Sequence, residues 1–276
     1  MSVKIRYATL TVGRNEEKLI GKTIQAMINQ TIKPTHIVLV DDGSSDNTTQ
    51  EVRFFTKKHK NLKLIIRRDR GYSALGTYLM ADVYNTGMKY LFKKKDWDYL
   101  IIVGADTFLP HNYAEEVINR MGHEYGVAGG YSPIFPFVKP DSVIGSGRVI
   151  RRNILEGISG FPRTYGWEEG CLLFALYKGY KTGHFRDILF QSRLPDTKTK
   201  RNYIGWGRGM KDDGYHPLHA IHRSTKIIIE EHKPIKAIKL LVGFFSHPFP
   251  KGTDFIEYRR ANYKHQIVRK IRNLLF

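Results

Sequence analysis

The chain has 276 residues, 41% hydrophobic and 26% charged, a balance that allows a sizeable core and excludes a disordered or low-complexity protein. Its single cysteine, Cys171, excludes a disulfide framework and a cysteine-rich zinc site. A formal net charge of +19, from 45 Lys and Arg against 26 Asp and Glu, favours anionic partners such as nucleotide phosphates, nucleic acid or lipid headgroups.

Strand and helix patterns alternate over the first part of the chain. The expected elements are strand 3–12, helix 15–30, strand 36–40, helix 47–59, strand 62–67, helix 73–93 and strand 99–105. Asn15 is expected to cap the first helix, and Ser45 or Asp46 the second. The apolar run HIVLV is typical of a strand buried on both faces. The alternation predicts a doubly wound, mostly parallel α/β sheet with flanking helices, which binds ligands at the carboxyl ends of its strands.

The second half of the chain is less regular. Residues 168–180 predict a helix that ends at Gly179, and residues 191–216, rich in glycine and polar side chains, predict a surface loop. From residue 221 onward 12 basic residues face 4 acidic ones, a net charge of +8. We therefore expect an α/β domain over 1–220 and a basic, amphipathic, helical C-terminal extension over 221–276.

An acidic block follows the second predicted strand, where a turn rich in Asp, Gly and Ser leads into a helix. It reads DDGSSDNT over 41–48 and is preceded by Asn15 and by the pair QT at 30–31. A strand, an Asn-Glu pair, a helix ending in QT and this block, in that order, resemble glycosyltransferase family 2, whose fold is the nucleotide-sugar-binding GT-A fold. The alternative is that the block only ends a strand and caps a helix.

The resemblance implies a site for a nucleotide-diphospho-sugar at the carboxyl ends of the strands. Asp41 and Asp42 would contact the nucleoside, since a carboxylate accepts hydrogen bonds from a base N–H or from ribose hydroxyls. Thr11, Gly13 and Asn15 would line the same pocket from the end of the first strand.

Basic residues follow the third predicted strand at Arg67, Arg68 and Arg70. A guanidinium binds phosphate oxygens through paired donors, so Arg70 is a candidate for the donor's diphosphate. The same side chains would also suit a solvated surface, and the sequence leaves both interpretations open.

The segment VGADTFLP after the fourth strand stands where the family carries its metal-binding acids. In the family, two acids separated by one residue hold a divalent cation against the diphosphate, which neutralises the leaving nucleotide. Here Gly104 replaces the first acid and Asp106 remains. We expect Asp106 to hold Mg²⁺ or Mn²⁺ together with diphosphate oxygens and waters, because Mg²⁺ needs few protein ligands. A plain strand-end turn is the alternative.

Residues 146–183 also resemble the family. In this segment the acidic pair Glu168-Glu169 stands where the family has Glu-Asp. An inverting transferase needs a carboxylate to take the acceptor hydroxyl's proton, so one of the two is the predicted catalytic base. The spacing to Leu172 favours Glu169, and the spacing to Gly179 favours Glu168. Alone, the pair would equally suit exposed residues in the first turn of a helix.

The basic C-terminal region carries IKAIKLLVGFF at 235–245 and VRKIRNLLF at 268–276. Three interpretations are open: a helix packed on the domain, a helix lying on an anionic membrane surface, or a nucleic-acid-binding segment. Packing is favoured for 235–245, with membrane contact next.

The resemblance covers residues 3–185 and implies an inverting hexosyltransferase acting by direct displacement. Its partners would be a nucleotide-diphospho-sugar donor, a glycan, lipid-linked or protein acceptor, and an anionic membrane surface. The alternatives are a nucleotide-binding protein that no longer transfers sugar and, less favoured, a nucleic-acid-binding protein. The first residues contain no apolar run typical of a secretory signal, so a cytoplasmic location with peripheral membrane contact is expected.

Overall fold

A computed structural model of the chain describes residues 4–135, 142–193 and 202–248. Its strands are β1 (Tyr7–Gly13), β2 (His36–Asp41), β3 (Leu62–Ile66), β4 (Tyr99–Ile102), β5 (Thr107–Phe108), β6 (Tyr125–Tyr131), β7 (Arg148–Arg151), β8 (Lys181–Leu189) and β9 (Gln191–Ser192). Its helices are α1 (Ile20–Ile28), α2 (Thr48–Thr56), α3 (Leu79–Leu91), α4 (Tyr113–Met121), α5 (Arg152–Gly157), α6 (Gly170–Tyr177), α7 (Tyr203–Asp212), α8 (Pro217–Ile229) and α9 (Pro234–Ser246).

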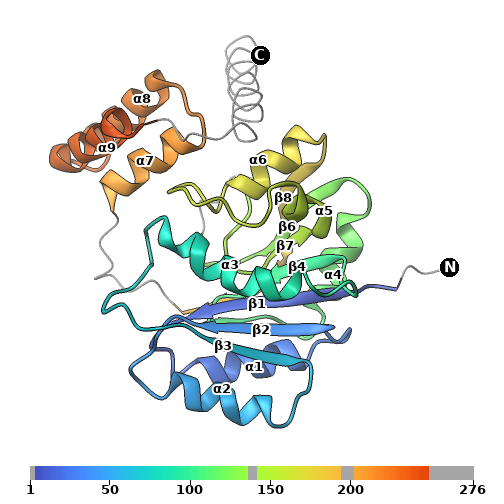
Figure 1. The fold of residues 1–276 in the computed structure, drawn as a ribbon. Coiled ribbons are helices and arrows are strands. Elements are labelled where there is room, and N and C mark those ends of the chain that lie inside the picture. The colour runs from blue at the N-terminus through green and yellow to red at the C-terminus, as the bar shows by residue number, and fades with distance from the viewer. Residues whose placement is uncertain (1–3, 136–141, 194–201, 249–276) are drawn as a thin grey trace.

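Seven strands form one sheet in the order β3-β2-β1-β4-β7-β6-β8, while β5 and β9 pair in a small second sheet. Helices cover both faces of the large sheet, and α7, α8 and α9 form a separate layer (Figure 1). The predicted fold class, a doubly wound, mostly parallel α/β sheet with flanking helices and a helical C-terminal extension, is confirmed.

The strands at the centre of the sheet divide their side chains between two cores. On β2, Val38 and Val40 enter the core beneath α3, whereas Ile37 and Leu39 enter the core beneath α1 and α2. All four are at most 3% exposed. Complete burial of such a side chain stabilises the fold by about 1.5–3 kcal/mol. Burial on both faces explains the uninterrupted apolar run of this strand.

One strand, β7, runs antiparallel to both of its neighbours, whereas the remaining neighbours in the large sheet pair parallel. The start of β7 therefore lies at the edge of the sheet where β4 ends. Gly147 N donates to Ile102 O at 2.7 Å, and Gly104 N donates to Ser146 Oγ at 2.7 Å. Residues about 40 positions apart in the chain meet at this edge, where such sheets bind ligands.

The predicted helices begin later than their sequence patterns indicated. Because α1 begins at Ile20, the prediction that Asn15 caps it is wrong. Asn15 has a left-handed backbone with φ of 58° and belongs to the loop before the helix. The α3 helix likewise begins only at Leu79. The N-cap of α2 is Asn47, so the prediction that Ser45 or Asp46 caps the second helix is wrong. Asp46 lies one residue earlier and accepts a hydrogen bond from Thr48 N at 2.9 Å.

Part of the predicted loop at 191–216 is instead helix α7, and its glycines explain the difference. A Cβ on Gly207 would lie 2.0 Å from Leu240 O, and one on Gly243 would lie 2.1 Å from Ile204 O, so that α7 and α9 meet backbone to backbone. Helices α7, α8 and α9 share a core of their own. The boundary predicted after residue 220 falls inside α8.

Two sequence predictions concern residues that the structure does not describe. Residues 194–201, part of the loop predicted at 191–216, and the tail at 268–276 lie outside the described residues. Within the described ranges, none of the helices is both long enough and apolar enough to cross a bilayer.

Candidate functional site

The acidic loop after β2 is folded by one of its own carboxylates. Asp41 Oδ1 accepts hydrogen bonds from the amide of Ser44 at 2.8 Å and from its hydroxyl at 2.7 Å. The other oxygen of Asp41 accepts from the hydroxyl of Thr49. Gly43 turns the loop with φ of 76°, and a Cβ there would lie 2.5 Å from the Cα of Asp69. Asp41 therefore shapes the loop through both oxygens.

The second carboxylate of the loop is held between two arginines. Asp42 is 3% exposed, and its Oδ1 lies 3.3 Å from Arg67 Nε, while Oδ2 pairs with Arg70. Arg67 is itself fixed by Thr86 Oγ1 at 2.7 Å. Within the described part of the chain, Oδ1 of Asp42 has ionic contact but no hydrogen-bond donor. The structure thus joins the predicted residues Asp42 and Arg70 and leaves one buried carboxylate oxygen of Asp42 without a hydrogen-bond donor.

The end of β1 forms the other side of this loop. Gly13 O accepts from Asp42 N at 2.9 Å. Asn15 Oδ1 accepts from Ser45 N at 2.9 Å, which ties the two loops together. Thr11 is fully buried, and its hydroxyl donates to Met27 Sδ at 3.7 Å. Of the three predicted lining residues, Gly13 and Asn15 contact the acidic loop, whereas the Thr11 side chain lies in the core.

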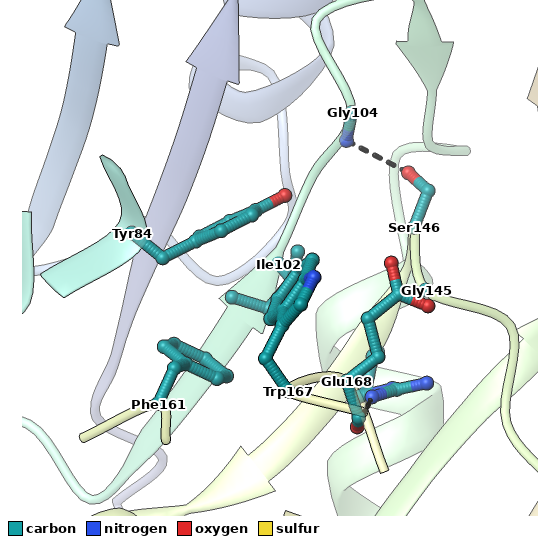
Figure 2. Close-up of a pocket in the computed structure, with 9 residues that line it drawn as sticks. Tyr84, Ile102, Gly104, Gly145, Ser146, Phe161, Trp167 and Glu168 are labelled. Atoms are coloured by element: carbon teal, nitrogen blue, oxygen red, sulfur yellow. Dashed lines mark hydrogen bonds between the residues drawn. The ribbon is translucent and has the colours of Figure 1, made fainter. Parts of the chain in front are cut away.

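A cavity of about 100 Å³ lies beside the end of β4 (Figure 2). Its lining residues are Tyr84, Ile102, Gly104, Gly145, Ser146, Arg148, Phe161, Trp167 and Glu168. The ring centroid of Tyr84 lies 4.8 Å from that of Trp167, and burial raises the pKa of the Tyr84 hydroxyl above its usual value. Aromatic side chains that face a few polar groups also line ligand pockets, but at about 100 Å³ this cavity is smaller than such pockets usually are.

One member of the predicted acidic pair reaches this cavity. Glu168 lines it, and Figure 2 shows its carboxylate directed toward Gly145 and Ser146. Arg148, 3% exposed, donates to the backbone carbonyl of Glu168 and fixes the loop that carries it. Glu169 is absent from the lining, and its carbonyl accepts from Leu173 N at 2.9 Å as the α6 helix begins. The sequence left both Glu168 and Glu169 as candidates for the catalytic base. Of the two, Glu168 is the one that lines the cavity.

The loop before Glu168 is braced by the C-terminal helices. Tyr165 N donates to Asp212 Oδ2 at 2.7 Å, and Arg208 of α7 donates to Tyr165 Oη at 2.7 Å. Asp212 is 1% exposed and also lies 2.8 Å from His247 Nε2. Nothing in the sequence predicted this contact between α7 and the loop before Glu168.

The predicted metal ligand is already paired with an arginine. Asp106 Oδ2 lies 3.3 Å from Arg193 Nε. A Cβ on Gly104 would lie 2.8 Å from Thr107 Oγ1, so the place of the family's first acid is closed. Across the described ranges there is no cluster of three or more His, Cys, Asp or Glu side chains that could hold a metal. This donor set does not fit a divalent cation held by the protein, and the Mg²⁺ or Mn²⁺ expected at Asp106 stays a prediction.

Comparison with known sequences gives one family and one relative. Residues 11–142 match the model of glycosyl transferase family 2. An uncharacterized glycosyltransferase of Mycoplasma pneumoniae, the MG025 homolog, is 22% identical over 146 residues, which are 51% of this chain and 46% of that protein. The matched part thus spans about half the length of this curated relative.

Comparison with solved structures gives the same fold. The mannosyltransferase PcManGT from Pyrobaculum calidifontis, in complex with GDP-Man and Mn²⁺, has a TM-score of 0.61 at 16% identity, covering 95% of this chain and 80% of its own. S. aureus TarS 1–349 in complex with UDP-GlcNAc has a TM-score of 0.57 at 15% identity, covering 87% of this chain and 71% of its own. These likenesses confirm the GT-A architecture expected from the sequence.

Proposed function

Because residues 11–142 match the model of glycosyl transferase family 2, we propose that this chain moves a sugar from a nucleotide-diphospho-sugar to an acceptor hydroxyl or lipid phosphate. The observation that carries the proposal is the shared sheet edge. The acidic loop after β2 and the cavity of Glu168 beside β4 lie at the same edge, with β1 between their strands. A donor lying along that edge would present its nucleoside to the loop and its sugar to the cavity.

The proposed chemistry is a single inverting displacement. The acceptor oxygen forms a bond to the anomeric carbon as the bond from that carbon to the diphosphate breaks, and the nucleoside diphosphate leaves with the bonding electrons. Glu168 takes the proton of an acceptor hydroxyl; a lipid phosphate acceptor, already anionic, would need no base. Proton removal of this kind contributes typically about 10²–10⁴-fold to a rate.

The nucleoside would be read by the acidic loop. Asp42, with its unused oxygen, would accept from a base N–H or ribose hydroxyl, while Asp41 keeps the loop in shape. GDP-Man and UDP-GlcNAc, which the two structural relatives bind, are the first donors to test. The family resemblance also predicts a Mg²⁺ or Mn²⁺ ion at Asp106, but the donor set there does not fit one, and no step of the proposed chemistry depends on it.

Nucleotide binding is the first test. We expect one of UDP or GDP, with the matching nucleotide sugar, to raise the melting temperature, since a ligand at 100 times its Kd stabilises the folded state by about 2.7 kcal/mol. Asp42→Asn should weaken that binding about tenfold through the loss of a charged acceptor. Asp98→Asn, at an exposed Arg–Asp pair with Arg6, is the matched control.

The alternatives give different results in the same assays. A chain that binds nucleotide but never releases nucleoside diphosphate from a nucleotide sugar would be a binding protein without transfer. A chain that no nucleotide stabilises, and that binds DNA or RNA with a steep dependence on salt, would be a nucleic-acid-binding protein. Either result would contradict the proposed transferase.

The surface of α8 and α9 supports a peripheral membrane site. On α9, Ile235, Ile238, Val242 and Phe245 follow one stripe at spacing i, i+3, i+7, i+10 and are each at least 50% exposed. Exposed lysines flank this stripe, and α8 adds a similar one through its exposed Leu218, Ile221 and Ile228. An apolar stripe bordered by lysine suits an anionic lipid surface.

Vesicle flotation tests this attachment. The full chain should float with vesicles containing phosphatidylglycerol, and raised salt should weaken the binding. The double variant Ile238→Glu, Phe245→Glu should stay in the bottom fraction. Phe54→Glu, whose side chain is as exposed as Phe245 at 54% but lies on α2, should float like the parent chain. Equal flotation of all three would contradict a membrane site on α9.

A further inference from the structure

Arg193 lies between two carboxylates, those of Glu16 and Asp106, beside the end of β4. Arg193 donates two hydrogen bonds to Glu16, at 2.7 and 3.0 Å, and its Nε lies 3.3 Å from Asp106 Oδ2. Glu16 precedes α1 and Asp106 follows β4, so the guanidinium joins the first and fourth strand ends. Two carboxylates that converge on one cation are the arrangement a bound metal would otherwise require.

The backbone holds Arg193 in this place. Residues 191–192 form β9, which pairs with β5, directly after Asp106. Arg193 N also donates to Asp106 O at 3.1 Å. The small sheet therefore fixes the Cα of Arg193 beside the acid, whereas its side chain is 50% exposed and can reach a ligand.

A chain of hydroxyl groups fills the space next to it. Gly104 N donates to Ser146 Oγ at 2.7 Å, and Ser146 Oγ donates to Thr107 Oγ1 at 2.7 Å. Thr107 Oγ1 lies 2.9 Å from Ser192 Oγ, the residue before Arg193. Neutral hydroxyl groups thus surround Gly104, the position from which a second acid would bind a metal. The last of them, on Ser192, is next to Arg193 in the chain.

We propose that Arg193 supplies the positive charge opposite the donor's diphosphate, so that Asp106 and Glu16 hold a guanidinium where relatives hold a divalent cation. This inference rests on the proposed transferase function. A guanidinium presents paired N–H donors that match phosphate oxygens, and its charge does not depend on pH in the physiological range. Arg193 would donate to the diphosphate oxygens as the sugar leaves, without giving up a proton.

A single guanidinium carries one charge where a divalent cation carries two. Arg14 follows β1, and Arg67 and Arg70 follow β3; each contacts Asp42 or Asp69. The net charge of +19 belongs to the chain as a whole, and it attracts an anionic nucleotide from a distance. The arrangement predicts nucleotide binding that needs no added metal.

The experiment measures binding of UDP and GDP by titration calorimetry, in EDTA and with Mn²⁺, for the parent chain and Arg193→Ala. We expect the parent chain to bind one of the nucleotides in EDTA, and Mn²⁺ to change its Kd little. Arg193→Ala should bind about tenfold more weakly in EDTA, because it loses a charged donor. Mn²⁺ should restore that binding, since Glu16 and Asp106 are then released for the ion.

A direct measurement of Mn²⁺ binding and a control variant accompany the titrations. Electron paramagnetic resonance of free Mn²⁺ should show uptake by Arg193→Ala and little by the parent chain. Arg120→Ala, which removes a similarly exposed Arg–Asp pair with Asp187, should behave like the parent. Binding by the parent only when Mn²⁺ is present, or binding in EDTA that Arg193→Ala leaves unchanged, would overturn the inference. Absence of any nucleotide binding, even with Mn²⁺, would overturn the proposed function itself.

Discussion

Glu168→Gln should lower the rate of sugar transfer by about 10²–10⁴-fold and leave nucleotide binding unchanged, because the amide cannot take a proton from the acceptor. The position of Glu168 on the cavity beside Gly104 supports the assignment. The rate is measured as release of nucleoside diphosphate from whichever nucleotide sugar binds, with water or an added alcohol as acceptor.

The neighbouring acid supplies the control for this substitution. Glu169→Gln should keep most of the activity, since Glu169 does not line the cavity. The double variant should be no slower than Glu168→Gln alone. Full activity in the double variant would rule out a base in this pair and would favour an acceptor that is already anionic.

Gly207→Val should separate α7 from α9 and destabilise the C-terminal helices by about 1–3 kcal/mol, the usual cost of overpacking. The added Cβ would meet Leu240 O at 2.0 Å and Phe244 N at 2.7 Å, and neither backbone atom can move aside cheaply. Hydrogen exchange followed by mass spectrometry should show faster exchange in α7, α8 and α9.

The same variant should slow transfer more than it weakens nucleotide binding. The reason is that α7 holds Tyr165, three residues before Glu168, through Asp212 and Arg208. Gly21→Ala is the control, because a Cβ there has no neighbour closer than 3.7 Å, and alanine favours a helix. Unchanged exchange in Gly207→Val would contradict the close packing of the two helices.

The N-terminal half of the fold was predictable because its signals are local. Apolar runs such as HIVLV mark strands buried on both faces, and the DDGS turn needs Asp and Gly at fixed offsets. The helix starts were harder to predict, because residue type alone does not show whether Asn15 caps a helix or belongs to a loop. There the chain first makes a loop that ties Asn15 to Ser45, and α1 begins at Ile20.

The remaining features depend on contacts that spacing does not encode. Glycines lower helix propensity, so residues 203–212 resemble a loop until the packing of α9 against them is known. Arg193 and Glu16 stand 177 positions apart. Which of two adjacent acids lines the cavity depends on the path of the loop before α6, where Arg148 donates to the carbonyl of Glu168. Asp41 and Asp42 share a motif, yet only the structure shows that Asp41 holds the loop through Ser44 whereas Asp42 pairs with Arg67 and Arg70.

Because Gly104 is closely surrounded, the free-energy cost of placing an acid there depends on whether its neighbours have already been replaced. An aspartate introduced alone would meet Thr107 Oγ1 at 2.8 Å and Ser146 Oγ at 3.1 Å from its Cβ, and its carboxylate would find Arg193 already engaged by Asp106. Smaller side chains at 107 and 146 would have to come first. A metal-binding acid at this position is therefore reachable only through several coupled changes, and the penalty for each depends on those already made.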